Sequence, residues 1–220
     1  IRRQRQMCIR DRFFPDARQL DFLRGLAAGL RVDGGQRGAA VRDLAADMLE
    51  NTRRRLRQRE EEDALIRAYR ILELIGQARL FDRGLDSEAL DTSRAEVAEW
   101  LRYKERKGRP VAPDEKGRIK LPRQLVASLL KHCKDPMGGK LLAMEKREFA
   151  LLQVTNRNYS LLIHGFESQA AGKAQEFGGV LDELEGLLRE DDAASAERIE
   201  NVRFRFLRVA GQAGCSGDRA

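Results

Sequence analysis

The fold class follows most directly from the sequence ALIRAYRILELIGQARLF, which runs from Ala64 to Phe81. Its apolar residues recur mostly three or four positions apart, which is the spacing of one face of an α-helix. These residues are Leu65, Tyr69, Leu72, Ile75 and Leu80. Acidic residues precede the segment and suit a helix N-terminus, and Gly84 follows it. The pattern predicts a helix over Glu62–Phe81.

Helical spacing continues on both sides of this segment, and no alternation of β-branched residues is long enough to predict a sheet. Further helices are predicted over Asp16–Leu30, Ala39–Arg59, Ser93–Lys107, Pro122–His132 and Ser195–Val209. We therefore expect an all-α protein, a helical bundle.

Three local features refine this expectation. Ser93 and Glu96 have the spacing of a capping box at a helix start. Three prolines between Arg109 and Pro122 predict an irregular loop insertion, with at most a short extended piece at Arg118–Leu121. The breakers Pro136, Gly138 and Gly139 predict an interruption before the next helix.

The last third of the chain carries the most regular apolar stripe. Its members are Ala170, Ala174, Phe177, Leu181, Leu184 and Leu188, at alternating steps of four and three. Such a stripe is buried in a core or faces a partner helix. The sequence alone leaves open whether it packs inside the bundle or against a second copy of the chain.

The positive charge is concentrated at the start of the chain. The 220 residues contain 42 Lys and Arg against 35 Asp and Glu, a net charge of +7. Residues 1–12 carry five arginines against Asp11 and so supply +4, which leaves +3 for the remainder. Their string RQMCIRDR resembles translated sequencing-adapter DNA, so we expect residues 1–12 to be non-native, residues 13–210 to form the helical domain and residues 211–220 to be a flexible tail.

A second basic run lies in the middle of a predicted helix. The arginines between Arg53 and Arg59 are followed at once by the acids Glu60–Asp63, so the local charges nearly cancel. We expect a solvated helix face with ion pairs, and a nucleic-acid patch as the minor alternative.

Cysteine usage and hydropathy exclude several classes of protein. The three cysteines are scattered and form no CxxC pair, which indicates a reducing, cytoplasmic compartment. No apolar run approaches the roughly 20 residues that span a bilayer. Glycine-rich phosphate loops are absent, so the sequence predicts no nucleotide cofactor.

Two histidines are the candidates for acid–base chemistry. His132 stands beside Cys133, with no further ligand at metal spacing, so we expect a helix-end cation and no metal site. His164 follows Arg157 by seven residues in RNYSLLIHG, which on a helix places both on one face about 10 Å apart. Imidazole and guanidinium together can cleave RNA without a metal. Two chains facing each other would bring two such Arg–His sets around one scissile bond. In the non-catalytic alternative, Arg157 is a surface residue and His164 lies at a helix end.

The string RNYSLLIHG resembles the R-x(4–6)-H motif of HEPN ribonucleases, with Asn158 as the usual polar residue after the arginine. Together with DMLENTRRR (Asp47–Arg55) and the helix at Ala64–Phe81, the likeness to type III CRISPR-associated CARF and HEPN proteins extends over Asp43–Val209. Tyr159 departs from the family, because a basic residue is common at this position.

The resemblance implies a homodimer in which Arg157, Asn158 and His164 of both chains form one metal-independent site that cleaves single-stranded RNA. It also implies activation by cyclic oligoadenylate through an N-terminal CARF domain, which we do not find in this sequence. Residues 13–60 are then the lead-in from that domain and residues 61–210 the catalytic bundle. A non-catalytic helical module for dimerisation or RNA binding is the alternative, and neither reading requires a membrane.

Overall fold

The structure is a computed structural model that describes residues 17–32, 35–144, 146 and 174–207. Within these ranges it contains α2 (Ala17–Gly29), α3 (Gly35–Arg57), α4 (Glu61–Asp82), β1 (Leu90–Asp91), α5 (Ala95–Arg106), β2 (Arg118–Ile119), α6 (Arg123–His132), α7 (Pro136–Met144), α8 (Ala174–Asp191) and α9 (Ala193–Leu207). The prediction of an all-α bundle is confirmed. None of these helices combines the length and the apolar character needed to cross a membrane.

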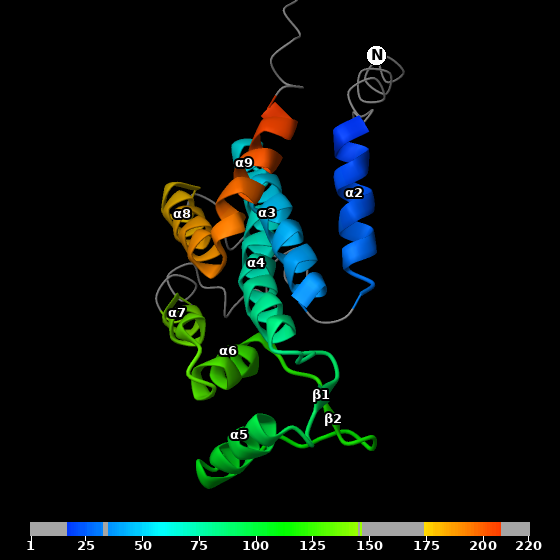
Figure 1. The fold of residues 1–220 in the computed structure, drawn as a ribbon. Helices are drawn as coiled ribbons and strands as arrows, with labels where there is room; N and C mark the ends of the chain where they lie inside the picture. The colour runs from blue at the N-terminus through cyan, green and yellow to red at the C-terminus, as the bar shows by residue number, and fades with distance from the viewer. Residues whose placement is uncertain (1–16, 33–34, 145, 147–173, 208–220) are drawn as a thin grey trace, which may run out of the picture.

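The long helices α3 and α4 form the centre of the bundle (Figure 1). Their facing surfaces are rich in buried alanines, which allow two helix backbones to approach closely. Five of these are less than 2% exposed: Ala45, Ala46, Ala64, Ala68 and Ala78. Helix α2 lies along one side of the pair, and α8 and α9 pack against the other.

The helix α5, the β1–β2 ladder and α6, residues 90–132, lie below this pair in Figure 1, and we call them the lower tier. The ladder is antiparallel and pairs Leu90 with Ile119, so the extended piece predicted near Arg118 is confirmed. Trp100 of α5 is fully buried, and its indole Nε1 donates to Ser128 Oγ of α6 at 3.3 Å. One face of α5 is therefore fixed against α6.

The apolar stripe of α8 belongs to the core of the bundle. Four of its members are at most 2% exposed: Phe177, Leu181, Leu184 and Leu188. They join the same apolar cluster as the central pair. The alternative of a face for a second copy is excluded for these four residues, while Ala170 lies outside the described residues.

The chain is interrupted before α7, but at residues 133–135; the prediction that Pro136, Gly138 and Gly139 form the break is wrong, because α7 begins at Pro136 and contains both glycines. Asp135 precedes the helix, and its Oδ1 accepts the backbone N–H of Met137 at 2.9 Å. Proline is favoured in the first turn of a helix, where its missing N–H needs no partner. Gly138 serves close packing here, because a Cβ on it would lie 2.7 Å from the carbonyl carbon of Leu130.

The capping box predicted at Ser93 is also wrong, although its helix is present as α5. The residue that caps α5 is Arg94, and no side chain caps the helix. Ser93 instead donates its N–H to Asp91 Oδ1 at 2.8 Å. Ser93 thus belongs to the turn after β1, where it is hydrogen-bonded to Asp91, and does not cap α5.

Replacing Gly138 by alanine is expected to cost about 1–3 kcal/mol of unfolding free energy, because the added methyl meets the backbone of α6. The matched control is Gly139→Ala, whose Cβ has no atom within 4 Å and which should stabilise α7 by up to about 1 kcal/mol. Urea unfolding of the two variants measures the difference. Equal effects would contradict the close contact between α6 and α7.

Candidate functional site

The residues predicted to be catalytic, Arg157, Asn158 and His164, lie outside the described residues, so their roles stay predictions. In the chain they fall between the end of α7 at Met144 and the start of α8 at Ala174. The described residues show how these two helices are held. They therefore define the frame to which the motif segment is attached.

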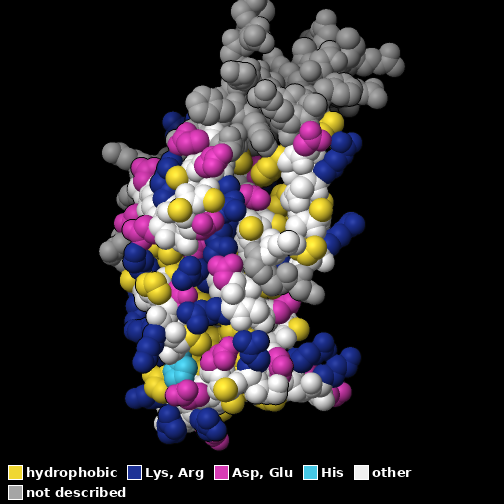
Figure 2. All heavy atoms as spheres, in the orientation of Figure 1, with side chains coloured by type: hydrophobic (Ala, Val, Ile, Leu, Met, Phe, Trp, Pro, Cys, Tyr) yellow, Lys and Arg dark blue, Asp and Glu magenta, His cyan; other side chains and the backbone are white. Residues whose placement is uncertain are grey.

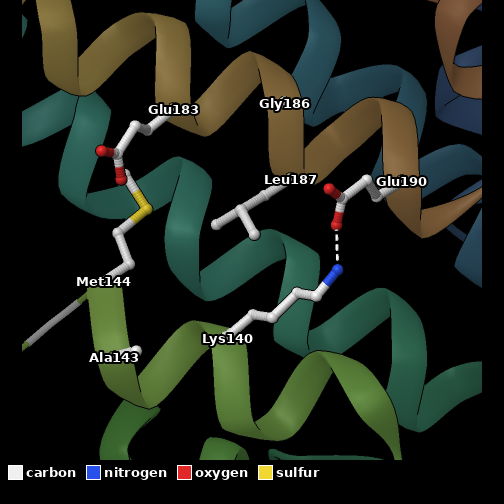
Figure 3. Close-up of a pocket in the computed structure, with 7 residues that line it drawn as sticks. All are labelled: Lys140, Ala143, Met144, Glu183, Gly186, Leu187 and Glu190. Atoms are coloured by element: carbon white, nitrogen blue, oxygen red, sulfur yellow. Dashed lines mark hydrogen bonds and ion pairs between the residues drawn. The ribbon is translucent and has the colours of Figure 1, made fainter.

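Helices α7 and α8 run in opposite directions beside each other (Figure 3). Lys140 of α7 forms an ion pair with Glu190 near the end of α8, and Met144 lies beside Glu183, two turns earlier in α8. Between them lies a pocket of about 380 Å³. The pocket adjoins Met144, the last residue of α7, so it lies at the end of α7 that precedes the motif segment in the chain.

The lining of this pocket is partly charged and partly apolar. Its residues are Lys140, Ala143, Met144, Glu183, Gly186, Leu187 and Glu190. None of them is a histidine, so the pocket by itself lacks the imidazole on which the predicted RNA cleavage depends. Within the described ranges, no group of three or more His, Cys, Asp or Glu side chains is arranged to hold a metal ion.

The frame around the pocket is held by a chain of ion pairs that we call the Arg42–Asp191 network, in which Arg42, Asp135 and Asp191 are buried. Its members are Asp82, Arg42, Asp191, Arg79, Asp135 and Arg83. Arg42 of α3 donates from Nε to Asp191 Oδ2 at the end of α8, at 2.5 Å, and also pairs with Asp82 of α4. Four parts of the bundle, α3, α4, the end of α8 and the turn before α7, are thereby joined.

The second half of the network centres on Asp135, whose side chain is 1% exposed. Its Oδ2 accepts hydrogen bonds from Arg79 at 2.8 Å and from Arg83 at 3.1 Å. Burial alone would raise the pKa of this carboxyl, but the hydrogen bonds from Arg79, the Met137 N–H and Arg83, with the charge of Arg79, lower it below its ordinary value. Asp135 is therefore held ionised at the start of α7.

The first half of the network is more deeply buried. Burial raises the pKa of Asp191, and the hydrogen bond and charge of Arg42 oppose this shift. Burial would lower the pKa of Arg42, but its hydrogen bonds to Asp82 and Asp191 raise it above its ordinary value. A guanidinium stays protonated in proteins, and two of them lie against Asp191, so we assign it as a carboxylate at neutral pH.

The other histidine, His132, lies in the lower tier and takes no part in the network. Its ring contacts that of Tyr103, with centroids 5.4 Å apart and planes tilted by 33°. The neighbouring thiol of Cys133 has a raised pKa because it is partly buried. This arrangement agrees with the expectation that His132 is a helix-end residue.

The basic run in α3 also has a structural role. Arg53 is 17% exposed and pairs with Glu50 in its own helix and with Glu185 of α8 at 2.5 Å. Arg55 pairs with Glu60 and Asp63 across the turn to α4. The expectation of ion pairs is confirmed, but Arg53 connects two helices and is not a solvated side chain.

These observations define an all-α bundle of the HEPN-like type. The chain matches the model of a protein family described as the Csm6 HEPN domain over residues 36–188, more than half of its length. The chain therefore belongs to the Csm6 HEPN domain family, a class of CRISPR-associated ribonuclease domains. The matched range begins in α3, ends in α8 and includes Arg157, Asn158 and His164. No curated protein matches the chain.

The Arg42–Asp191 network was not predicted from the sequence. Arg42 and Asp191 are 149 positions apart, and Arg79 and Asp135 are 56 apart. No local spacing links such pairs. The sequence signal was that Arg42 stands next to Val41 in the apolar stripe of α3. This position becomes informative only when the partner of Arg42 is known.

The substitution Arg42→Met is expected to lower the free energy of unfolding by about 3–5 kcal/mol, because it removes the closest partner of the buried Asp191 carboxylate and also the pair with the partly exposed Asp82. Arg70→Met is the matched control, since it removes an exposed pair with Glu73 in one helix and should cost less than about 1 kcal/mol. Urea unfolding at neutral pH measures both. Similar losses of unfolding free energy in the two variants would show that the Arg42 pairs contribute no more to stability than an exposed ion pair.

Asp135→Asn is expected to destabilise the protein at pH 7 by roughly 1.5–3 kcal/mol, the range for hydrogen bonds to a charged group. The folded-state pKa of Asp135 lies below its ordinary value of 3.8. Its contribution is therefore complete above that value and is lost as the pH falls through the folded-state pKa.

The difference between wild type and Asp135→Asn should consequently shrink when urea unfolding is repeated between about pH 5 and pH 3. Asp21→Asn, which alters an exposed pair with Arg24, serves as the control and should change little at any pH. A difference that stays constant across this range would contradict the ionised assignment of Asp135.

Proposed function

We propose that the chain is the catalytic domain of a CRISPR-associated antiviral endoribonuclease that cleaves single-stranded RNA. The observation that carries the proposal is the family match over residues 36–188, which includes Arg157, Asn158 and His164. The match supports the family, and the three residues supply the chemistry that such a domain needs. In this proposal residues 61–210 are the catalytic bundle, residues 13–60 are its lead-in, and the protein acts in the cytoplasm.

His164 is the proposed acid–base residue. The 2′-oxygen of the RNA attacks the neighbouring phosphorus, and the bond from phosphorus to the 5′-oxygen breaks. Imidazole can accept the 2′-hydroxyl proton or return a proton to the 5′-oxygen, since its ordinary pKa lies near neutral pH. Arg157 stabilises the negative charge that builds on the phosphate, and the amide of Asn158 can donate to a phosphate oxygen. These roles need no metal ion.

A homodimer is proposed because Arg157 and His164 of one chain are expected to be too far apart to act together on one phosphate. On a continuous helix, residues seven positions apart have Cα atoms about 10 Å from each other. Two copies related by a two-fold axis would bring two such pairs to one scissile bond. In the complete system, cyclic oligoadenylate bound to a CARF domain would then control how the two copies meet.

The test is cleavage of a labelled single-stranded RNA by the purified chain in EDTA. His164→Ala and Arg157→Ala should each reduce the rate by about 100-fold or more, the range for loss of a general acid–base group or an oxyanion partner. Arg59→Ala, a substitution of an exposed arginine outside the motif, is the control and should stay within about twofold. Wild-type rates in both motif variants would refute the assignment and leave a non-catalytic module.

A further inference from the structure

The lower tier carries a concentration of positive charge that the chain's net charge conceals. Residues Arg102–Lys134 contain eleven Lys and Arg against three acids, a net charge of +8. The whole chain carries +7, so the other 187 residues together carry −1. Figure 2 shows Lys and Arg side chains gathered along the lower end of the visible face, over the lower tier.

Most cations of this stretch also lack acidic partners, in contrast to those of the central helices. Among the described residues, seven near the ends of α5 and α6 form no ion pair: Arg102, Lys104, Arg106, Lys107, Arg109, Lys131 and Lys134. All but Lys104 are exposed. Exposed cations without counter-charges produce a positive potential that attracts polyanions. The arginines of the Arg42–Asp191 network, by comparison, are already neutralised.

An aromatic pair lies among these cations. Tyr103 is one of few large apolar side chains exposed in the described residues, at 38%, and its contact with His132 brings the last turns of α5 beside the end of α6. Lys107 Nζ lies 6.0 Å from the centre of the Tyr103 ring. Exposed aromatic rings between cations are the surface on which bases of single-stranded nucleic acids stack while the phosphates meet the charges.

We propose that this basic face, formed by Arg102, Tyr103, Arg106, Lys107, Arg109, Lys131 and His132, binds single-stranded RNA at a site separate from the catalytic motif. The choice of RNA as the ligand rests on the proposed function. The basic face would add to that function by binding RNA substrates that are long enough to reach beyond the catalytic site. A membrane fits the face less well, because Tyr103 is the one large apolar side chain exposed within Arg102–Lys134 in the described structure. Basic residues in the last turn of a helix also stabilise the helix through its dipole. That role does not account for an exposed tyrosine ring among them.

The experiment measures binding of a fluorescent 20-nucleotide single-stranded RNA by anisotropy, with the full chain carrying His164→Ala so that no cleavage intervenes. Removal of Arg102, Arg106 and Arg109 together, each to Gln, should weaken binding at least tenfold. The slope of log K against log[salt] should fall by about 2, since each lost phosphate contact on a single strand contributes about 0.7. The matched control removes three exposed arginines elsewhere, Arg31, Arg57 and Arg59, and should change binding less than twofold.

Equal weakening by both triple variants, or none by either, would overturn the proposal. Thermal unfolding of both triple variants should match the parent, because the substituted side chains are exposed. A second arm replaces RNA with vesicles containing phosphatidylserine, and loss of vesicle binding with unchanged RNA binding would also overturn it. Tyr103→Phe should keep RNA affinity, whereas Tyr103→Ala should lose about tenfold, the scale of one stacked base.

Cleavage separates this proposal from the catalytic one. With His164 intact, the Arg102, Arg106 and Arg109 triple variant should raise KM for the 20-nucleotide RNA at least tenfold and leave the cleavage of a tetranucleotide unchanged. An inactive wild-type chain would refute the ribonuclease assignment alone, because the anisotropy measurement does not depend on cleavage. Equal KM values for the long RNA would refute the basic face alone.

Discussion

The buried pair between Arg42 and Asp191 constrains the arrangement of the whole bundle. A buried ion pair adds little net stability, but breaking it leaves a charge without water or partner. Helix α8 therefore has one register in which Asp191 meets Arg42, and a shift along α3 would separate these two buried charges. Gly38 makes room for the neighbouring contact, because a Cβ there would lie 2.5 Å from Asp82 Oδ1 and 3.1 Å from the Ala78 carbonyl oxygen.

The Arg42–Asp191 network fixes one end of each of the two helices that flank the motif segment in the chain. Asp135 fixes the start of α7, and Asp191 fixes the end of α8, which runs in the opposite direction. The end of α7 and the start of α8, between which the chain carries the predicted catalytic residues, therefore lie at the same end of this helix pair. Because catalysis is sensitive to displacements of about 1 Å, a scaffold with fixed helix registers suits such a segment.

Patterns within one helix were predictable from the sequence, and relations between helices were not. The spacing from Leu65 to Leu80 predicted α4 because burial of one face repeats every three or four residues. Gly138 was wrongly interpreted as a helix breaker. Glycine is needed there because the backbone of α6 lies too close for a side chain, and no local sequence pattern reveals that contact. For the site, the sequence supplied Arg157 and His164 through a short motif, but the partners of Asp135 depended on the folded arrangement.

The same physical distinction applies to charge. Two groups of arginines differ among the described residues: Arg42 and Arg53 join helices through buried or partly buried pairs, whereas Arg102 and Arg106 lie at the surface without an acidic partner there. The excess of +3 outside residues 1–12 suggested a weakly basic protein, because a net charge adds these two populations together. Only cations that are not already neutralised can release counterions when a phosphate arrives. The quantity relevant to an RNA partner is therefore the number of unpaired cations on one face, which the fold determines and the composition does not.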